Sequence, residues 1–419
     1  MVSIGAVISA ARLVIICLLH SFVRYVRFSS PVVAVCRVAR RRHLLPPWLA
    51  PPVLHIDEIT SQSLSMILKR AVVIVGQEPL GDGKMSTIRK ISFIDAEGVP
   101  RLNRVQTRYL ICKSSPGGVA ETFISIVYGL HLNEIAGLRR GRLCPELVYT
   151  GVHWTGHYLL LMEFIHGTRP SVSSGINSVQ QIDAFIVELA RFHRDSLHIG
   201  LDDPEWRQLA LDGSAGPVVS LLQKFVIGQI WQQTSRQYNP AEVEAQRPLI
   251  EYGLAELPEI QTQVLHRFPT VMAHGDLHCG NIIVADDGRF RLVDWQASCV
   301  RPIFFDLCYF IGTSVPIQLR REHMDRWLRL YLDEIGLAHT SKEVVDECFA
   351  VCLYSVLLPL EFMAFLIKTD SKSGNMHFES SGRRALAMLE DYHTEKQLHA
   401  LIQSEANNSE KLSLWRNRK

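Results

Sequence analysis

The stretch Ala273–Gln296, which reads AHGDLHCGNIIVADDGRFRLVDWQ, constrains the possible folds of this chain more than any other. Two short apolar runs lie on either side of the turn signal Asp286-Asp287-Gly288, a combination typical of a tight β-hairpin. Asn281 stands directly before the first run, and Asp294 directly follows the second. The pattern therefore predicts a hairpin that brings the side chains of Asn281 and Asp294 together.

Four polar residues of this stretch are candidates for catalysis. Asp276 and Asn281 have the spacing of a phosphotransferase catalytic loop, H-x-D-x-x-x-x-N, which begins at His274. Phosphoryl transfer from ATP depends mainly on positioning and charge stabilisation, and Mg²⁺ prefers oxygen ligands. We therefore expect Asn281 and Asp294 to bind Mg²⁺ on the phosphates of ATP. Asp276 would accept the proton of an attacking hydroxyl, and His274 would brace the loop by hydrogen bonds to the backbone.

Two other interpretations of these residues stay open. His274, Asp276 and His278, followed by Cys279, could form a metal cluster of a hydrolase. A metal cluster needs further ligands, and none follows at a helical i+3 or i+4 spacing nearby. The stretch could also be an ordinary polar turn.

These residues resemble the aminoglycoside phosphotransferase and choline kinase superfamily of small-molecule kinases. Val-Asp-Trp-Gln at 293–296, followed by Asp-Leu-Cys-Tyr-Phe at 306–310, is most similar to its CHK kinase-like (ecdysteroid-kinase-like) branch. The resemblance covers roughly residues 60–400 and is specific around 273–310. It implies an α+β, two-lobed protein-kinase-like fold with a β-rich N-lobe and a helical C-lobe. It also implies that Asp306 supports the catalytic loop, for which an exposed helix N-cap is the alternative.

The composition of the whole chain indicates a globular protein. The 419 residues are 47% hydrophobic and 21% charged, and the net charge of +2 gives no electrostatic reason to expect a nucleic-acid partner. The nine cysteines form no C-x-x-C pair. This usage predicts reduced thiols in a cytosol-like compartment.

Residues 1–56 differ in composition from the rest of the chain. They contain seven arginines, and no acidic residue precedes Asp57. Residues 2–23 are largely apolar but include Arg12 and His20, and a central arginine in a spanning helix costs about 2.5–3.5 kcal/mol. We expect a membrane anchor, joined by a stiff proline-rich linker to a catalytic domain on the cytoplasmic side. A mitochondrial presequence and a misassigned start codon are the alternatives.

Residues 57–168 are predicted to form a nucleotide-binding lobe. Strand-like runs at 71–76 and 88–94 are separated by Gly81 and Gly83. Glycines in such a turn let backbone N–H groups approach phosphates. An ordinary hairpin gives the same pattern.

Lys113 closes the apolar strand 107–113, as the kinase lysine that pairs with the α- and β-phosphates does. An edge lysine at a strand end is the alternative. Glu134, on a helix predicted over 122–138, is placed to reach Lys113.

Two further strands are predicted at 144–149 and 157–164. The second ends near Glu163 and Ile165. The resemblance implies that the backbone of these residues binds adenine, whereas periodicity alone indicates only a buried strand.

Residues 169–405 are predicted to form a helical lobe with the catalytic loop, followed by a disordered tail at 406–419. The helix after Ser178 carries an apolar stripe at 3.6-residue spacing, and His193 on it is expected to be structural. Strands are expected only around 281–296. Further amphipathic patterns occur at 216–234, 241–265, 322–335, 342–368 and 383–403.

Aromatic residues gather around Asp306. At helical spacing they are typical of a core, and lining of an acceptor pocket is the alternative. They are Phe304, Phe305, Tyr309, Phe310, Phe362 and Phe365.

These observations predict an ATP-dependent kinase that phosphorylates a hydroxyl of a small molecule. Asp306 begins the next predicted helix only twelve residues after Asp294, which leaves too short a segment for the peptide platform of a protein kinase. The alternative is a membrane-associated pseudokinase without turnover. Such a protein should have lost Lys113, Asp276, Asn281 or Asp294, and all are present. The sequence does not indicate the acceptor or the oligomeric state.

Overall fold

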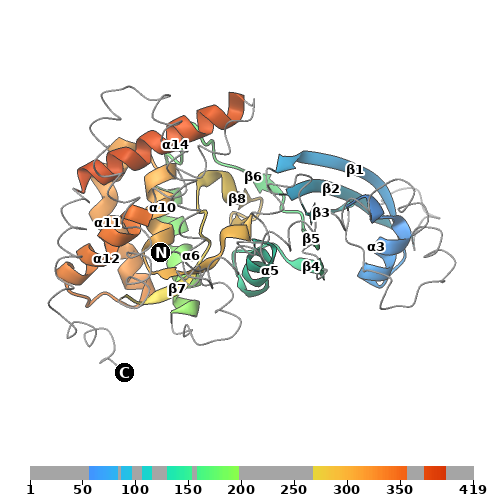
Figure 1. Ribbon diagram of the computed structural model, residues 1–419, viewed down its shortest axis with the longest axis horizontal. Helices are drawn as coiled ribbons and strands as arrows, with labels where there is room; N and C mark the ends of the chain where they lie inside the picture. Colours follow the sequence, from blue (N-terminus) through green and yellow to red (C-terminus); the bar gives the residue numbers. More distant parts are fainter. Residues whose placement is uncertain are drawn as a thin grey trace, which may run out of the picture. The chain divides into compact units, whose positions relative to one another are not determined.

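The computed structural model describes residues 56–83, 86–96, 106–115, 130–152, 158–197, 268–355 and 372–392. They fall into two compact units, which are described separately (Figure 1). The first contains residues up to Arg139 together with Pro145–Ile165, and the second contains Arg140–Cys144 and the residues from His166 onward.

Several predictions concern residues outside these segments. They include the anchor at 2–23, the helices at 216–234 and 241–265, parts of the helices at 122–138, 342–368 and 383–403, and the tail at 406–419. Among the helices that are described, none has both the length and the apolar character needed to span a membrane.

A five-stranded antiparallel sheet forms the centre of the first unit, with the strand order β1-β2-β3-β5-β4. β1 continues well past the predicted run at 71–76 and includes both Gly81 and Gly83. β4 begins at Leu147, three residues later than predicted. The strands are β1 (Val72–Gly83), β2 (Ser86–Asp95), β3 (Arg108–Ser114), β4 (Leu147–Val152) and β5 (Tyr158–Glu163).

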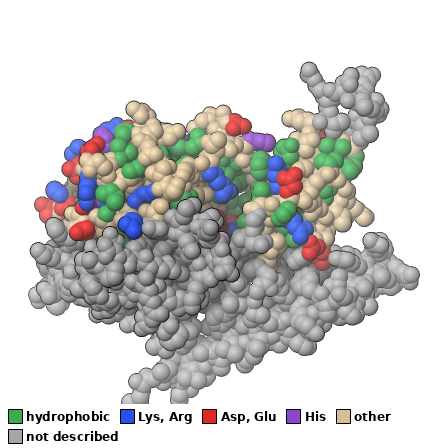
Figure 2. All heavy atoms as spheres, turned by 90° about the horizontal axis from the view of Figure 1, so that it is seen from above, with side chains coloured by type: hydrophobic (Ala, Val, Ile, Leu, Met, Phe, Trp, Pro, Cys, Tyr) green, Lys and Arg blue, Asp and Glu red, His purple; other side chains and the backbone are tan. Residues whose placement is uncertain are grey.

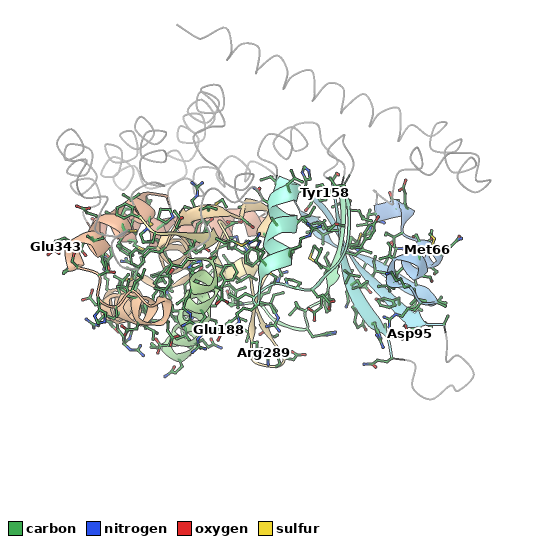
Figure 3. All side chains as sticks on the ribbon, turned by 90° about the horizontal axis from the view of Figure 1, so that it is seen from below. Met66, Asp95, Tyr158, Glu188, Arg289 and Glu343 are labelled. Carbon is green, nitrogen blue, oxygen red and sulfur yellow. The ribbon has the colours of Figure 1, made fainter. Side chains whose placement is uncertain are left out.

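One face of this sheet packs against η1 (Ile56–Glu58) and α3 (Ser61–Leu68), and Figure 3 labels Met66 on this helix. A capping box between Thr60 and Ser63 begins α3. The helix was not predicted, because its three serines favour caps and turns over helix interiors. Strand residues alternate between faces, so every second residue joins this core. It contains Ile56, Ile59, Leu64, Val72, Ile91, Phe93, Leu110, Cys112, Leu159 and Leu161.

Helix α5 (Leu130–Arg140) lies against the opposite face of the sheet. Lys113 alternates with the core-facing residues of β3, so its side chain points to this opposite face. The ring of Tyr158 on β5 stacks on His131 of α5, with 5.4 Å between the centroids (Figure 3). The two faces of one sheet thus separate a hydrophobic core from the face that carries Lys113.

The described residues of the second unit are mainly helical (Figure 1). Ser178 caps the first helix, accepting a hydrogen bond from the N–H of Gln181. The predicted apolar stripe of this helix, α6, is buried, and α6 packs against α11. Helix α10 packs against α12 and α14. The helices are α6 (Val179–Ser196), α10 (Phe305–Ser314), α11 (Ile317–Ile335), α12 (Lys342–Ser355) and α14 (Lys372–Asp391).

The expectation that strands of this unit occur only around 281–296 was wrong. Besides the hairpin β8 (Ile282–Ala285) and β9 (Phe290–Leu292), β6 (Gly167–Thr168) pairs with β8. A separate ribbon pairs β7 (Thr270–Ala273) with β10 (Cys299–Pro302). Strands of two to four residues are too short to show an alternating pattern. The ribbon joins the two ends of the catalytic stretch, because Ala273 pairs with Cys299.

Charged side chains of both signs are interspersed on the face shown in Figure 2. In the second unit, ion pairs such as Arg326–Asp183 and Arg321–Asp391 link opposite charges locally. The distribution is in keeping with a net charge of +2.

Candidate active site

The predicted hairpin brings the ends of the candidate site together. Gly288 closes the turn with a φ of +78°, a left-handed conformation that favours glycine. The N–H of Val293 donates to the carbonyl of Asn281 over 3.0 Å. Asn281, and Asp294 directly after Val293, therefore lie at the same end of the hairpin. The tip of the hairpin is at the other end, near Arg289, which Figure 3 labels.

His274 is buried and braces the loop from inside. Its Nδ1 accepts the N–H of Asp276 over 3.3 Å, so the ring proton is on Nε2, which donates to the carbonyl of Val293 over 3.0 Å. The ring also packs on Trp295, with 4.6 Å between the centroids. His274 thus ties the start of the catalytic loop to the residue before Asp294.

Asp306 is fully buried beneath the same loop. Its carboxylate accepts the N–H groups of His274 over 2.6 Å and of Gly275 over 3.0 Å, and His193 Nε2 lies 3.2 Å away. Burial alone would raise the pKa of Asp306, but the hydrogen bond and charge of His193, together with the hydrogen bond from the N–H of His274, hold the pKa below its usual value. The alternative of an exposed helix cap for Asp306 is excluded.

Gly275 is required by the close packing of this loop. Its φ is +82°, and an added Cβ would lie 2.0 Å from the carbonyl oxygen of Ala297. Any side chain here would therefore move the N–H that Asp306 binds.

Asp276 has both carboxylate oxygens oriented by neighbours. The hydroxyl of Tyr309 donates to Oδ1 over 2.6 Å, and Asn281 Nδ2 donates to Oδ2 over 3.2 Å. His278 Nδ1 accepts the N–H of Gly280, which leaves the ring proton on Nε2, 3.7 Å from Asp276 Oδ2. About a quarter of the side chain, 24%, is exposed, so the carboxylate can be reached from solvent.

The predicted metal ligands have suitable donor atoms. Asn281 ends the short turn η3 (Cys279–Asn281) and uses its Nδ2 for the carbonyl and carboxylate of Asp276, which leaves the amide oxygen as the atom that can bind a cation. Asp294 has a φ of 67°, and strained non-glycine residues of this kind cluster at functional sites. An amide oxygen and a carboxylate, from two residues at the same end of one hairpin, are donors of the kind that Mg²⁺ prefers.

Helix α10 holds the catalytic loop through several side chains along its length. Asp306 and Tyr309, three apart on one face of the helix, bind the backbone at His274 and the carboxylate of Asp276. Ser314, near the end of the helix, accepts the N–H of Cys279 over 2.8 Å. Tyr309 was predicted only as a core or pocket aromatic. Its three-residue spacing from Asp306 was the one signal of its role.

A buried arginine on α14 was also missed. Arg384 donates to the carbonyls of Val172, Ser173 and Thr313 at 2.5–3.2 Å. Burial lowers the pKa of Arg384. The sequence marked this segment only as amphipathic, because an arginine on such a pattern is usually solvated.

The hydrolase interpretation does not fit this geometry. Both ring nitrogens of His274 are hydrogen-bonded to backbone, so His274 cannot act as a ligand beside Asp276 and His278. Within the described segments, no group of three or more His, Cys, Asp or Glu side chains is arranged to hold a metal.

In the first unit, Lys113 and Glu134 form the expected contact. Lys113 Nζ lies 2.7 Å from Glu134 Oε1, and the side chains are 4% and 1% exposed. Removal of either partner would leave the other as a buried charge, so each fixes the other. The predicted role of Lys113 towards phosphates remains a prediction.

The other predicted nucleotide residues lie at the two ends of the same sheet. Gly81 and Gly83 end β1 at the hairpin with β2. Glu163 ends β5, and its N–H donates to the carbonyl of Glu146 over 2.9 Å, so this N–H is already in use. Ile165 is the last residue of the first unit and is half-buried.

An aromatic pair near this end of β5 was not predicted. The ammonium of Lys90 lies 4.2 Å from the ring centroid of Tyr109 and 4.5 Å from that of Phe164. Both contacts are within the range of cation–π attraction. Lys90 alternates in β2 with the core residues, so it lies on the same face as Lys113.

Most of the aromatic residues around Asp306 belong to the core. Phe304 packs on Tyr331 and Phe349, and Phe310 packs on Phe185 with 4.5 Å between the centroids. The predicted partners Phe362 and Phe365 lie outside the described segments.

The buried ring of His274 should make stability depend on pH. Burial lowers its pKa, against the opposing charges of Asp306 and Asp276. The unfolded chain binds a proton near pH 6.5 and the folded chain does not, so stability falls as the pH drops below about 6.5. When the pH is lowered from 7 to 5, we expect the free energy of unfolding to fall by about 1 kcal/mol less in His274→Gln than in the parent. Urea unfolding at the two pH values measures the difference.

The matched control is His339→Gln, which replaces an exposed histidine of the same unit. It should keep the parental slope. An unchanged slope in His274→Gln would show that the ring is protonated in the folded chain.

Comparison with protein families now adds to this geometry. The model of the Ecdysteroid kinase-like family matches residues 223–342, which include the catalytic loop, the hairpin and α10. Over these residues, the chain is similar to the ecdysteroid kinase-like family. This match confirms the resemblance predicted from the Val-Asp-Trp-Gln and Asp-Leu-Cys-Tyr-Phe sequences. A comparison with curated proteins found no significant match.

Solved structures of small-molecule kinases are also similar. Choline kinase from Cryptosporidium parvum Iowa II has a TM-score of 0.48 at 13% identity, covering 86% of this chain and 97% of that one. Ethanolamine kinase from Plasmodium vivax has a TM-score of 0.46 at 12% identity, covering 76% and 84%. At these values, no residue role is transferred, and the site rests on its own contacts.

The described residues have an α+β architecture. The first unit is built on a five-stranded sheet and the second on helices, as predicted.

Proposed function

We propose that the chain is an ATP-dependent phosphotransferase that phosphorylates a hydroxyl of a small molecule. The observation that carries this proposal is the environment of Asp276. Its carboxylate is held by Tyr309 and Asn281, and it keeps 24% of its surface exposed. A carboxylate that is fixed in direction but open to solvent suits a base that accepts a proton from a bound hydroxyl.

The remaining residues of the catalytic loop have complementary roles in this proposal. Asn281 and Asp294 would hold Mg²⁺ through oxygen atoms, and the ion would neutralise charge on the transferred phosphoryl group. His274 keeps Asp294 in register with the loop through Val293. Asp306 orients the loop and does not touch the reacting atoms.

The first unit would bind the nucleotide. Lys113, held by Glu134, would pair with the α- and β-phosphates of ATP. Backbone N–H groups around Gly81 and Gly83 would cover the phosphates. The backbone after Glu163, as far as Ile165, would contact the adenine.

A small-molecule acceptor is supported by the short segment after Asp294. Residues 295–302 form the turn η4 (Trp295–Ala297) and β10, and α10 begins at Phe305. Because β10 pairs with β7, the segment between Asp294 and α10 is too short to form a peptide platform as well.

A catalytically inactive scaffold is the second candidate. An active enzyme is favoured over an inactive scaffold because the chain keeps Lys113, Asp276, Asn281 and Asp294. Every cysteine in the described segments is reduced and buried, which supports a cytosol-like compartment.

The first test is nucleotide binding with Asp294→Asn. Asp294 carries the charge of the proposed metal site, so the variant should bind ATP at least about tenfold more weakly in the presence of Mg²⁺. Calorimetry with and without Mg²⁺ measures the change. The control is Asp287→Asn, at the tip of the same hairpin, which should bind as the parent does. Equal MgATP affinity in parent and Asp294→Asn would remove Asp294 from the metal site.

A further inference from the structure

We propose that the hydroxyl of Tyr309 covers Oδ1 of Asp276 and thereby suppresses hydrolysis of ATP by water. This inference rests on the proposed function and adds a positioning residue to it. In a kinase, water competes with the acceptor hydroxyl for the same base. A phenol fixed on the base removes one of the two oxygens at which water can be activated.

The contact between the two side chains is short and enclosed. The Tyr309 oxygen lies 2.6 Å from Asp276 Oδ1, whereas Tyr309 itself is only 2% exposed. Burial, together with the charge of Asp276, raises the pKa of Tyr309 well above its ordinary value. The phenol therefore stays protonated and remains a donor to the carboxylate.

The two oxygens of Asp276 have different surroundings. Oδ1 meets the phenol of Tyr309, which comes from inside the helical unit. Oδ2 meets the Nδ2 of Asn281 at 3.2 Å and the Nε2 of His278 at 3.7 Å, both longer and weaker contacts. His278 and Asn281 belong to the catalytic loop itself. The oxygen left for a substrate hydroxyl is therefore Oδ2.

Packing alone does not explain a tyrosine at this position. Its ring is buried, as is every residue of α10, and phenylalanine would fill the same space except for the hydroxyl. A buried hydroxyl needs a partner, and Tyr309 finds its partner in the one carboxylate proposed to act as base. The hydroxyl therefore has a role at Asp276 that the ring does not need.

The reaction that Tyr309 would suppress is the hydrolysis of ATP. A water oxygen attacks the γ-phosphorus while its proton passes to the Asp276 carboxylate. The bond between the γ-phosphorus and the bridging oxygen breaks, ADP leaves, and phosphate forms. Asp276 then releases the proton to solvent. With Oδ1 covered, a single water position at Oδ2 remains, and the acceptor displaces that water on binding.

The test is release of phosphate from MgATP in the absence of any acceptor. Tyr309→Phe, which loses only the hydroxyl, should hydrolyse MgATP about tenfold faster than the parent, a change of about 1.4 kcal/mol in the barrier. Tyr392→Phe removes another phenol of the same unit, outside the site, and should hydrolyse as the parent does. A second change, Asp276→Asn in the Tyr309→Phe chain, should abolish the gain.

Each outcome decides the matter. If Tyr309→Phe keeps the parental melting temperature and MgATP affinity but shows no gain, the inference is wrong while the proposed function stands. If the parent itself does not bind MgATP, both the inference and the proposed function are wrong. If Tyr309→Phe melts early, Tyr309→Met, which also lacks a donor, must show the same gain, and parental hydrolysis there would overturn the inference.

Discussion

Replacing Asp306 by alanine is expected to lower the free energy of unfolding of the helical unit by about 3–5 kcal/mol. The change leaves the N–H groups of His274 and Gly275 and the ring of His193 without their buried acceptor. Turnover should fall as well, because the loop loses its support from α10. Urea unfolding of the full chain measures the first effect.

The effect of Asp306→Ala should depend on pH in a definite direction. The pKa of Asp306 is lowered in the folded chain, so its contribution is fully present above the unfolded value of about 3.9. It is lost as the pH falls through the lower, folded value. The difference between parent and variant should therefore be constant from pH 7 to about pH 5 and should shrink in stronger acid.

Asp333→Ala, which removes an exposed carboxylate of α11, is the control and should change stability by less than about 0.5 kcal/mol. If Asp306→Ala were as stable as that control, the hydrogen bonds to the loop would contribute nothing net.

Replacing Asp276 by asparagine is expected to reduce phosphoryl transfer about 10²–10⁴-fold while MgATP binds nearly as before. Asparagine keeps the size of the side chain but cannot accept the proton of the attacking hydroxyl. Because the acceptor is not identified, transfer is measured with γ-labelled ATP and a cell extract separated into small-molecule and protein fractions. The label should enter the small-molecule fraction with the parent and not with the variant.

Asp286→Asn, in the exposed turn of the hairpin, is the control and should transfer label as the parent does. Normal transfer by Asp276→Asn would exclude Asp276 as the base. Label that depends on Asp276 but enters only the protein fraction would instead mean a protein acceptor.

Local patterns in the sequence predicted the parts of this site that local chemistry determines. The turn at Gly288 predicted the hairpin, and the lysine at the end of an apolar strand predicted the contact of Lys113 with Glu134. The apolar stripe after Ser178 predicted the buried face of α6. The hairpin turn involves residues close in the chain, and the stripe follows a fixed period, whereas Lys113 and Glu134 are 21 positions apart and were paired through the resemblance to kinases.

The missed features depend on contacts between distant residues. Tyr309 reaches Asp276 across 33 positions, and Arg384 reaches Val172 across 212. No periodicity marks such pairs, because a tyrosine on a buried helix face and an arginine on an amphipathic helix both have commoner explanations. The ribbon of β7 and β10 was missed for a related reason, since its strands are short and their pairing is set by the loop between them.

One buried carboxylate joins four parts of the second unit. Asp306 of α10 contacts the backbone at His274 and the ring of His193 on α6, and that ring is hydrogen-bonded to Tyr331 of α11. The orientation of the Asp276 carboxylate therefore depends on how these three helices pack. A small shift of α6 or α11 against α10 would thus also turn the carboxylate of Asp276.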